Sequence, residues 1–518
     1  MPRHQRDDDE ERPLLLRPDR ETATETEEDV ASQYSALSEH REGEGEDTSD
    51  SDTTNTIRRI GFGTDDQENP KAWPPGQKLS NVAIIALMAI LSPLASSMFT
   101  PGISQIAEDL DTNEQKVIAT TTGFVIMLGF GPLVLAPLSE TFGRRALYVW
   151  CFSAFTILQV GAALSPNIGA LIAVRAVSGF FGSVGLANGG GTISDMYEPS
   201  QRAGIFGWYL LGPLLGPTLG PLFGGVIVSR LGWRWIYWIL TIVCAINTAI
   251  GYFSLRETYA PVLLGRRKAK LQNEAGENTK IHFDGEDERP VWMKLKASMK
   301  RPFVIFVQPI VLIMSSYQAL IFGTTYSIYT NMQSIYSEAP YHFNSEQIGL
   351  LYLGPGLGFL TSVWFLVPRI DTVFNRLTRK NGGQSLPEFR LPLANVGSVL
   401  IPASLLWFAW TVQYRVHWLA SIAATYFYGV GQVVVFNSVQ NYYIDAFSQY
   451  AASAIAGGSV FRSLVGGLVP LFAPKLFEQI GYGWGISCFG FVAVLIAPSP
   501  VLFYYFGARI RERFQLKF

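Results

Sequence analysis

Long apolar stretches alternate with short polar loops along most of the chain after about residue 80. A helix of about 20 apolar residues is long enough to cross the hydrocarbon core of a bilayer. The pattern therefore predicts twelve membrane-spanning helices, with ends placed to within a few residues. They cover residues 81–101, 117–138, 146–165, 168–190, 203–228, 234–254, 303–330, 347–367, 392–411, 416–441, 451–474 and 484–506.

The twelve predicted spans divide into two sets of six. The first set forms an N-terminal bundle over residues 80–255, and the second forms a C-terminal bundle over residues 302–507. A polar segment, 256–301, connects the bundles, and residues 508–518 form a short cytosolic tail. The predicted fold class is an all-α membrane protein with 12 transmembrane helices in two six-helix halves.

A faint internal repeat agrees with this division into halves. The stretch from Leu353 to Arg376 has the outline of the stretch from Gly129 to Arg145: a glycine-rich apolar helix, an acidic residue and then a basic residue. Parallel repeats of this kind relate the two halves of many secondary transporters.

Residues 1–79 differ from the rest of the chain because they are polar and largely acidic. A segment so poor in large apolar residues cannot bury enough surface to order itself, so we expect a disordered cytosolic tail. Within it, Glu10–Leu16 (EERPLLL) resembles the acidic dileucine signal that directs membrane proteins to vacuoles or lysosomes. The first apolar run begins near Asn81 and is expected to act as both the targeting signal and the first span.

Lysine and arginine positions orient the predicted spans. Basic residues cluster after the second span, in the 256–301 segment, in residues 369–390 and in the C-terminal tail, which all fall on one side. Because positively charged loops remain in the cytosol, both termini and the central segment are predicted to be cytosolic. The rule holds by majority only, since three basic residues fall on the opposite side: Arg230, Arg234 and Arg415.

Residues 131–145, GPLVLAPLSETFGRR, form an apolar helix that reaches a carboxylate, turns through a glycine and continues into two arginines. Glycine permits a tight turn, and the carboxylate of Glu140 is expected to pair with an arginine or to lie near the positive end of a neighbouring helix. A membrane-anchoring loop is the alternative, but it explains only the arginines. We predict a conformational latch at the membrane surface, made of Glu140, Gly143, Arg144 and Arg145.

Two arginines lie deep in the predicted spans, Arg175 in the fourth and Arg462 in the eleventh. A charge at such depth is costly unless it faces a partner or a water-filled space, so both are candidates for transport or coupling. No Asp or Glu lies near the middle of any predicted span, and Asp195, at a cytosolic end, is the remaining candidate for carrying a proton. Two buried arginines without buried carboxylates also favour an anionic cargo.

The fifth predicted span carries glycines every four residues. This spacing leaves one helix face without side chains and lets a neighbouring helix approach closely. Prolines next to the glycines weaken the backbone hydrogen bonding and permit bending. We predict a bending, tightly packed gate helix in preference to a static packing face, with candidate residues Gly212, Pro213, Gly216, Pro217 and Gly220.

Polar side chains in the seventh and tenth spans are candidates for lining a substrate cavity, because polar groups avoid lipid. About half of them are expected only to bond neighbouring helices. The set comprises Gln308, Gln318, Tyr326, Gln432, Asn437, Gln440 and Asn441.

Other kinds of chemistry have little support. The three cysteines lie far apart within apolar stretches, and the five histidines show no metal-ligand spacing, so no metal site and no cofactor are expected. No nucleophile, base and acid appear together, which argues against an enzyme. The chain also lacks a nucleic-acid-binding pattern.

Taken together, these residues resemble a fungal major facilitator superfamily transporter of the twelve-spanner drug:proton antiporter branch. The resemblance extends over about residues 66–513, and it departs from the general superfamily pattern at Ala136 and Glu140, where Gly and Asp are usual. Its most specific segments are ENPKAWP (68–74), APLSETFGRR (136–145), LIAVRAVSGFFGS (171–183) and GPLLGPTLGPLFGG (212–225).

The resemblance implies two six-helix halves that rock about a central cavity and export cargo from the cytosol with the proton gradient. Known relatives carry azoles, cycloheximide, polyamines, organic acids and secondary metabolites. The resemblance further implies that Arg175 assists proton coupling and that the latch residues lock the outward-facing state.

We therefore expect a secondary active transporter that exports small organic molecules, such as drugs, toxins or a secondary metabolite, by proton antiport. The alternatives are an exporter of organic-acid anions or polyamines, and a membrane sensor or receptor without transport activity. The expected partners are a small-molecule substrate, the lipid bilayer and protons, and the protein is expected to be a monomer. Its expected location is the plasma membrane, with the vacuolar membrane as the alternative.

Overall fold

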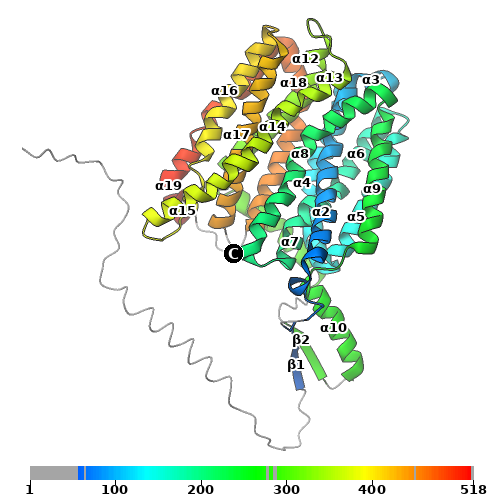
Figure 1. The fold of residues 1–518 in the computed structure, drawn as a ribbon, viewed down its shortest axis with the longest axis vertical. Helices are drawn as coiled ribbons and strands as arrows, with labels where there is room; N and C mark the ends of the chain where they lie inside the picture. The colour runs from blue at the N-terminus through cyan, green and yellow to red at the C-terminus, as the bar shows by residue number, and fades with distance from the viewer. Residues whose placement is uncertain (1–55, 64–65, 276–278, 284–288, 448–450, 515–518) are drawn as a thin grey trace, which may run out of the picture. The chain divides into compact units, whose positions relative to one another are not determined.

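The apolar stretches form long helices in the computed structural model, which describes residues 56–63, 66–275, 279–283, 289–447 and 451–514 (Figure 1). The dileucine-like segment Glu10–Leu16 lies outside the described residues. The first half contains α2 (Pro75–Ser97), α3 (Ile103–Asp109), α4 (Glu114–Phe142), α5 (Arg144–Ala163), α6 (Ile168–Gly182), α7 (Val184–Met196), α8 (Pro199–Leu231) and α9 (Arg234–Ser254).

A connecting region follows, with α10 (Ala260–Ala275), a strand and α11 (Val291–Phe306). The second half contains α12 (Pro309–Ser337), α13 (Ser345–Leu351), α14 (Leu353–Thr361), α15 (Val367–Lys380), α16 (Ala394–Gln413), α17 (Trp418–Ala446), α18 (Ala451–Ile496) and α19 (Ser499–Arg513).

The spans in the described residues agree with the predicted twelve. Ten stretches are long and apolar enough to cross a bilayer, and the end of α11 with α12, bent by 94°, provides one more. The last stretch, Ser453–Arg513, is 61 residues long and is broken at Gly481, where φ is 78° and ψ is 162°. Because 61 helical residues would extend about 90 Å, three times the bilayer core, this stretch supplies two spans.

Polar residues begin several helices, and glycines end others. Asn113 and Asn167 precede α4 and α6, and their side chains each accept a hydrogen bond from a backbone N–H three residues later, at 2.9 Å. Such a side chain satisfies one of the N–H groups that a helix start leaves free. Gly143 and Gly232 follow α4 and α8 with φ of 96° and 88°, so each chain reversal occurs at a residue without a side chain.

Each half has its own hydrophobic core. One core joins buried residues from α2 to α9, and the other joins residues from α11 to α19. Tyr326 is an exception, since it belongs to α12 in the second half but packs into the core of the first half. The two halves therefore touch through the side chain of Tyr326.

A small two-stranded sheet joins residues on either side of the first half. Strand β1 (Thr56–Ile60) pairs with β2 (Thr279–Phe283) of the connecting region. Nearby, Arg267 of α10 forms an ion pair with Asp66 at 2.5 Å. A backbone N–H from Glu68 and the Arg267 guanidinium hold the pKa of the Asp66 carboxyl below its usual value. The polar tail expected over residues 1–79 therefore has ordered structure near its end.

Figure 1 shows α3 and α13 at one end of the long helices, and α10 beyond the opposite end. We call these the α3 end and the α10 end. The links that follow α4, α9 and α15 lie toward the α10 end, and the links that follow α8 and α12 lie toward the α3 end.

Candidate functional site

The start of α5, at the α10 end, is held by a carboxylate from a distant part of the chain. Glu257, which follows α9, accepts hydrogen bonds from the backbone N–H groups of Arg144 at 2.8 Å and Arg145 at 3.1 Å. It also accepts from the N–H groups of Thr258 and Tyr259. Because the first N–H groups of a helix lack partners within it, the buried carboxylate acts as a cap supplied from 113 residues away.

The side chain of Arg144 connects three elements around this cap. Its Nε donates to Oδ2 of Asp195 at 3.3 Å, at the end of α7, and its guanidinium also bonds the hydroxyl of Ser139 in α4. Thr258 donates to the same Asp195 oxygen at 3.2 Å. We call Ser139, Arg144, Asp195, Glu257 and Thr258 the N-terminal charge cluster, since it ties α4, α5, α7 and the segment after α9 together.

The arginines of the predicted latch have partners other than Glu140 in the structure. Glu140 is exposed, and no ion pair or hydrogen bond joins it to an arginine among the described residues. Successive helix residues are about 100° apart around the axis, so Glu140 lies on the outer face of α4 whereas the adjacent Ser139 points inward. Glu257 and Asp195 hold Arg144 in its place, and Arg145 donates to the backbone oxygen of Tyr252 at 2.8 Å.

Asp195 remains the candidate proton carrier that the sequence predicts. In the structure it pairs with Arg144 and Thr258 inside the N-terminal charge cluster.

Glu257→Gln is expected to destabilise the folded protein by about 1–3 kcal/mol, because four N–H groups lose a charged acceptor. The measurement is the melting temperature of the purified protein in detergent. Glu140→Gln is the matched control, since it makes the same chemical change on the same end of the first half; its effect should stay within about 0.5 kcal/mol. Equal losses in the two variants would contradict this assignment of Glu257.

The second half repeats the arrangement with different residues. Arg390, just before α16, pairs with Asp445 at the end of α17 at 2.7 Å and also with Asp371 of α15. The pair matches Arg144 and Asp195 of the first half, because in each half an arginine at the start of the third span bonds an aspartate at the end of the fourth. Arg511 of α19 makes two further bonds to Glu388, which is buried, at 3.0 and 3.1 Å. Both halves therefore carry a charge cluster at the same position in the repeat.

Arg175, in α6, is fully buried and bound to the first span. It donates to the backbone oxygens of Ala95 at 2.8 Å and Ser96 at 3.3 Å. These carbonyls lie near the end of α2, where a helix leaves oxygens without N–H partners. The guanidinium also lies 5.0 Å from the ring centre of Phe99 and 4.5 Å from that of Phe124. Arg175 therefore stabilises the end of α2, where the chain breaks before α3.

Arg462, in α18, has a more open environment. Its side chain is partly exposed and makes one long hydrogen bond, of 3.4 Å, to the hydroxyl of Ser459 on its own helix. Its guanidinium lies 5.0 Å from the ring centre of Phe322 and 5.1 Å from that of Phe436. The two arginines predicted together thus differ in their contacts.

The gate-helix glycines lie against α2. A Cβ added at Gly216 would meet Pro93 at 2.8 Å, and one at Gly212 would meet Ile90 at 3.2 Å. One added at Gly220 would overlap Ser97. Gly224 continues the same face and was not among the predicted residues; a Cβ there would overlap the backbone of Met98. Helix α8 is continuous through Pro213, Pro217 and Pro221, so in this structure the prolines do not break it.

Hydrogen bonds between the halves gather toward the α3 end. The hydroxyls of Ser96 in α2 and Tyr326 in α12 are 2.9 Å apart. Near the start of α4, Thr122 donates to the backbone oxygen of Gly467 in α18 at 2.7 Å. An ion pair of 2.8 Å joins Arg230 of α8 to Glu346 of α13. Arg234 forms an ion pair with Asp109 at 2.9 Å. Two of the three arginines that break the positive-inside rule, Arg230 and Arg234, therefore each have an acidic partner.

Comparison with known proteins identifies this architecture. The model of the Major Facilitator Superfamily matches residues 85–470. The chain belongs to the Major Facilitator Superfamily. It is accordingly a multi-pass membrane transporter and not an enzyme, as the sequence predicted.

Similar members of the superfamily come from fungi. The MFS-type transporter penM of Penicillium rubens is 39% identical over 461 residues, which cover 88% of this chain and 90% of the relative. The MFS transporter cpaT of Aspergillus oryzae is 37% identical over 92% of this chain and 96% of its own length. The efflux pump radE of Floropilus chiversii is 37% identical over 88% of this chain and 85% of its own length.

Solved structures agree on the fold. The xylose transporter XylE from E. coli, in a partially occluded inward-open conformation, matches with a TM-score of 0.61 and 14% identity. The match covers 83% of this chain and 98% of XylE. The human organic anion transporter MFSD10 matches with a TM-score of 0.53 and 17% identity, over 83% of this chain and all of that protein. At such identities the likeness shows the superfamily fold alone.

The predicted cavity residues of this transporter divide into different environments. Gln308 lies in the sharp bend between α11 and α12, directly before the first residue of α12. Gln318 and Gln432 are buried, and Gln432 accepts from Thr325 at 3.1 Å within the second half. The remaining side chains on α17 are half-buried along one side of the helix: Asn437, Gln440 and Asn441.

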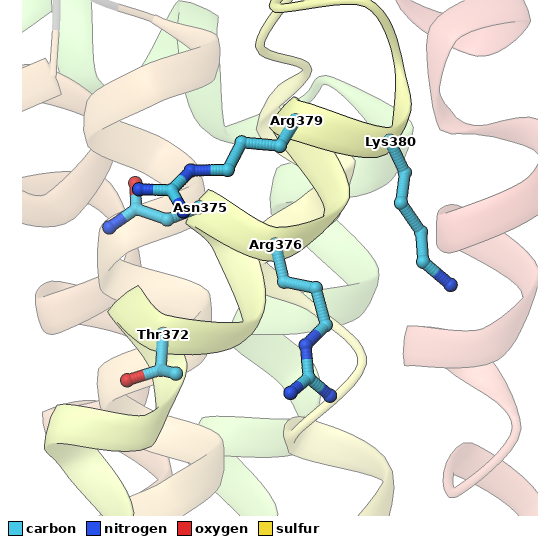
Figure 2. Close-up of a pocket in the computed structure, with 5 residues that line it drawn as sticks. All are labelled: Thr372, Asn375, Arg376, Arg379 and Lys380. Carbon is cyan, nitrogen blue, oxygen red and sulfur yellow. The ribbon is translucent and has the colours of Figure 1, made fainter.

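A hollow of about 570 Å³ lies on α15 (Figure 2). Figure 2 shows Arg376 and Lys380 extending from one side of the helix, and Asn375 and Arg379 from the other. With Thr372 these residues line the hollow. No predicted cavity residue lines it, and its three basic side chains belong to the stretch that oriented the spans, so it is not the substrate site that the sequence predicted.

Tyr326→Phe is expected to weaken the contact between the halves at the α3 end, because it removes the hydroxyl that meets Ser96. The closed conformation loses about 0.5–1.5 kcal/mol of stabilisation, so the equilibrium between conformations shifts about 2–10-fold toward those open at the α3 end. Distances between spin labels on the loops after α3 and before α13 measure that shift. Tyr329→Phe is the control, since its buried hydroxyl has no partner among the described residues; a shift of the same size there would contradict the prediction.

Proposed function

We propose that this transporter exports small organic molecules, such as secondary metabolites, drugs or toxins, from the cytosol. The observation that carries the proposal is similarity over most of the chain to a protein named as an efflux pump, radE, together with penM and cpaT. Two bundles with separate cores, joined by side-chain contacts toward one end, suit an alternating-access mechanism.

We infer that the α10 end faces the cytosol and the α3 end faces outward. Basic residues concentrate at the α10 end, where α15 and the charge clusters lie, as the positive-inside rule requires. With hydrogen bonds between the halves gathered toward the α3 end, this orientation describes a carrier closed to the outside. Tags on the two termini test it: both must be inaccessible in intact cells, and termini on opposite sides would contradict it.

We propose proton antiport as the driving reaction and the plasma membrane as the location, with the vacuolar membrane as the alternative. Asp and Glu in the described spans lie near helix ends, so the proton is taken up there and not in mid-span. Asp195 is the first candidate, because it is partly buried and shares Arg144 with the rest of the N-terminal charge cluster. We further propose that the protein acts as a monomer.

Deletion of the gene tests export directly. Loss of the transporter should raise the intracellular level of its cargo and make cells more sensitive to that cargo. Restoring the gene should reverse both effects, and collapsing the proton gradient should reproduce them. A deletion that changes transcription but leaves accumulation unchanged would contradict export and favour a sensor.

A further inference from the structure

Arg462 has unused hydrogen-bonding capacity in the interior of the second half. A guanidinium has five N–H donors. The one hydrogen bond described for Arg462 is a long bond to Ser459, and its Nε, which is buried, has no partner among the described residues. The Nε of Arg175 also has no partner among the described residues, but its Nη1 and Nη2 donate to two backbone carbonyls, aromatic rings surround it and solvent does not reach it. Of the two arginines, Arg462 is the one open to a ligand.

Aromatic rings from two helices frame this guanidinium. Phe322 of α12 and Phe436 of α17 have ring centres 6.5 Å apart, and both rings are partly exposed. Each lies about 5 Å from the Arg462 guanidinium, within the range of a cation–π contact. Tyr326 stands 5.0 Å from Phe322, but its hydroxyl already meets Ser96. The frame therefore offers flat apolar faces beside a single positive charge.

The charge of Arg462 is not balanced by a carboxylate. Asp and Glu residues in the described spans lie near helix ends, and none forms an ion pair with Arg462. A charge removed from water without a partner is costly, so the site favours a ligand that brings the opposite charge. The half-buried amides of Asn437, Gln440 and Asn441 extend from Phe436 along α17 and provide polar groups beside it.

We propose that Arg462 binds the acidic group of the cargo, and that the cargo is an organic anion in which a carboxylate is attached to a planar aromatic ring. The guanidinium receives the two carboxylate oxygens in a bidentate pair, which an arginine forms better than a lysine. The ring of the cargo lies against Phe322 and Phe436. This assignment rests on the proposed export function and names the class of molecule that is exported.

Binding to the purified full-length protein tests the site. Three tritiated probes share one ring and differ in charge: 2-naphthoate, 2-naphthamide and 2-naphthylmethylammonium. The wild type should bind the carboxylate at least about 10-fold more tightly than the amide, and the ammonium most weakly. In Arg462→Gln the carboxylate and the amide should bind within about twofold of each other, and Arg462→Lys should keep part of the preference.

Arg509→Gln is the matched control, because it removes an exposed arginine from α19 with the same change of charge. It should leave the preference unchanged. The proposal is overturned if the wild type binds the amide as well as the carboxylate, or if Arg462→Gln keeps the full preference.

Transport in proteoliposomes separates this site from the proposed function. Carboxylate that binds through Arg462 but is not moved across the membrane supports the site and contradicts export. Transport of the amide or the ammonium without carboxylate binding supports export and overturns the site.

Discussion

Gly143→Ala is expected to reduce the stability of the transporter by about 3–5 kcal/mol and to lower the amount of folded protein sharply. At φ 96° and ψ 154° the residue occupies a backbone region that residues with a side chain rarely adopt, at a penalty of about 1–3 kcal/mol. A Cβ would also overlap Oε2 of Glu257. Displacing that carboxylate leaves buried N–H groups without an acceptor, at about 1–3 kcal/mol each.

Gly232→Ala separates the two causes. Gly232 has nearly the same backbone, with φ 88° and ψ 163°, but a Cβ there would meet nothing closer than Gln105 at 4.0 Å. This variant should lose only the backbone part, about 1–3 kcal/mol. Thermal melting and size-exclusion profiles in detergent measure both variants. Equal losses would show that contact with Glu257 contributes nothing at Gly143.

Arg175→Ala is expected to abolish transport and to destabilise the fold by about 3–5 kcal/mol. If Arg175 served only in transport, its loss would leave the stability of the fold unchanged. The substitution leaves the oxygens of Ala95 and Ser96 without a donor inside the protein, and each hydrogen bond to a charged group is worth about 1.5–3 kcal/mol. It also empties the space between Phe99 and Phe124. Melting temperature and cargo efflux are the measurements.

Comparison with Arg175→Lys and Arg462→Gln gives this test its control. The lysine keeps the charge and one donor group, so it should recover part of the stability. Arg462→Gln removes an arginine with one long hydrogen bond and should lose less stability than Arg175→Ala. An Arg175→Ala protein with wild-type melting temperature would contradict the role of Arg175 in holding the break after α2.

The latch shows how far sequence reasoning reached at the candidate site. Gly143 and Arg144 were predicted because a glycine turn and adjacent charges are local features. Glu140 is predicted either to pair with an arginine or to lie near the positive end of a neighbouring helix, and in the structure it lies on the exposed face of α4. Glu257, the residue that caps α5, is 113 positions away and gives no local signal beyond being an acid just after the sixth span.

The sequence by itself determined the number of spans, their grouping into two halves and the depth of Arg175 and Arg462. These properties follow from runs of about 20 apolar residues, because a bilayer dictates the length and polarity of each span one segment at a time. Only the tertiary structure decided which acid meets which arginine, and which of the two arginines is enclosed. Such pairings depend on how separate helices pack, and residues far apart in the chain, such as Arg144 and Glu257, become neighbours only in the folded bundle.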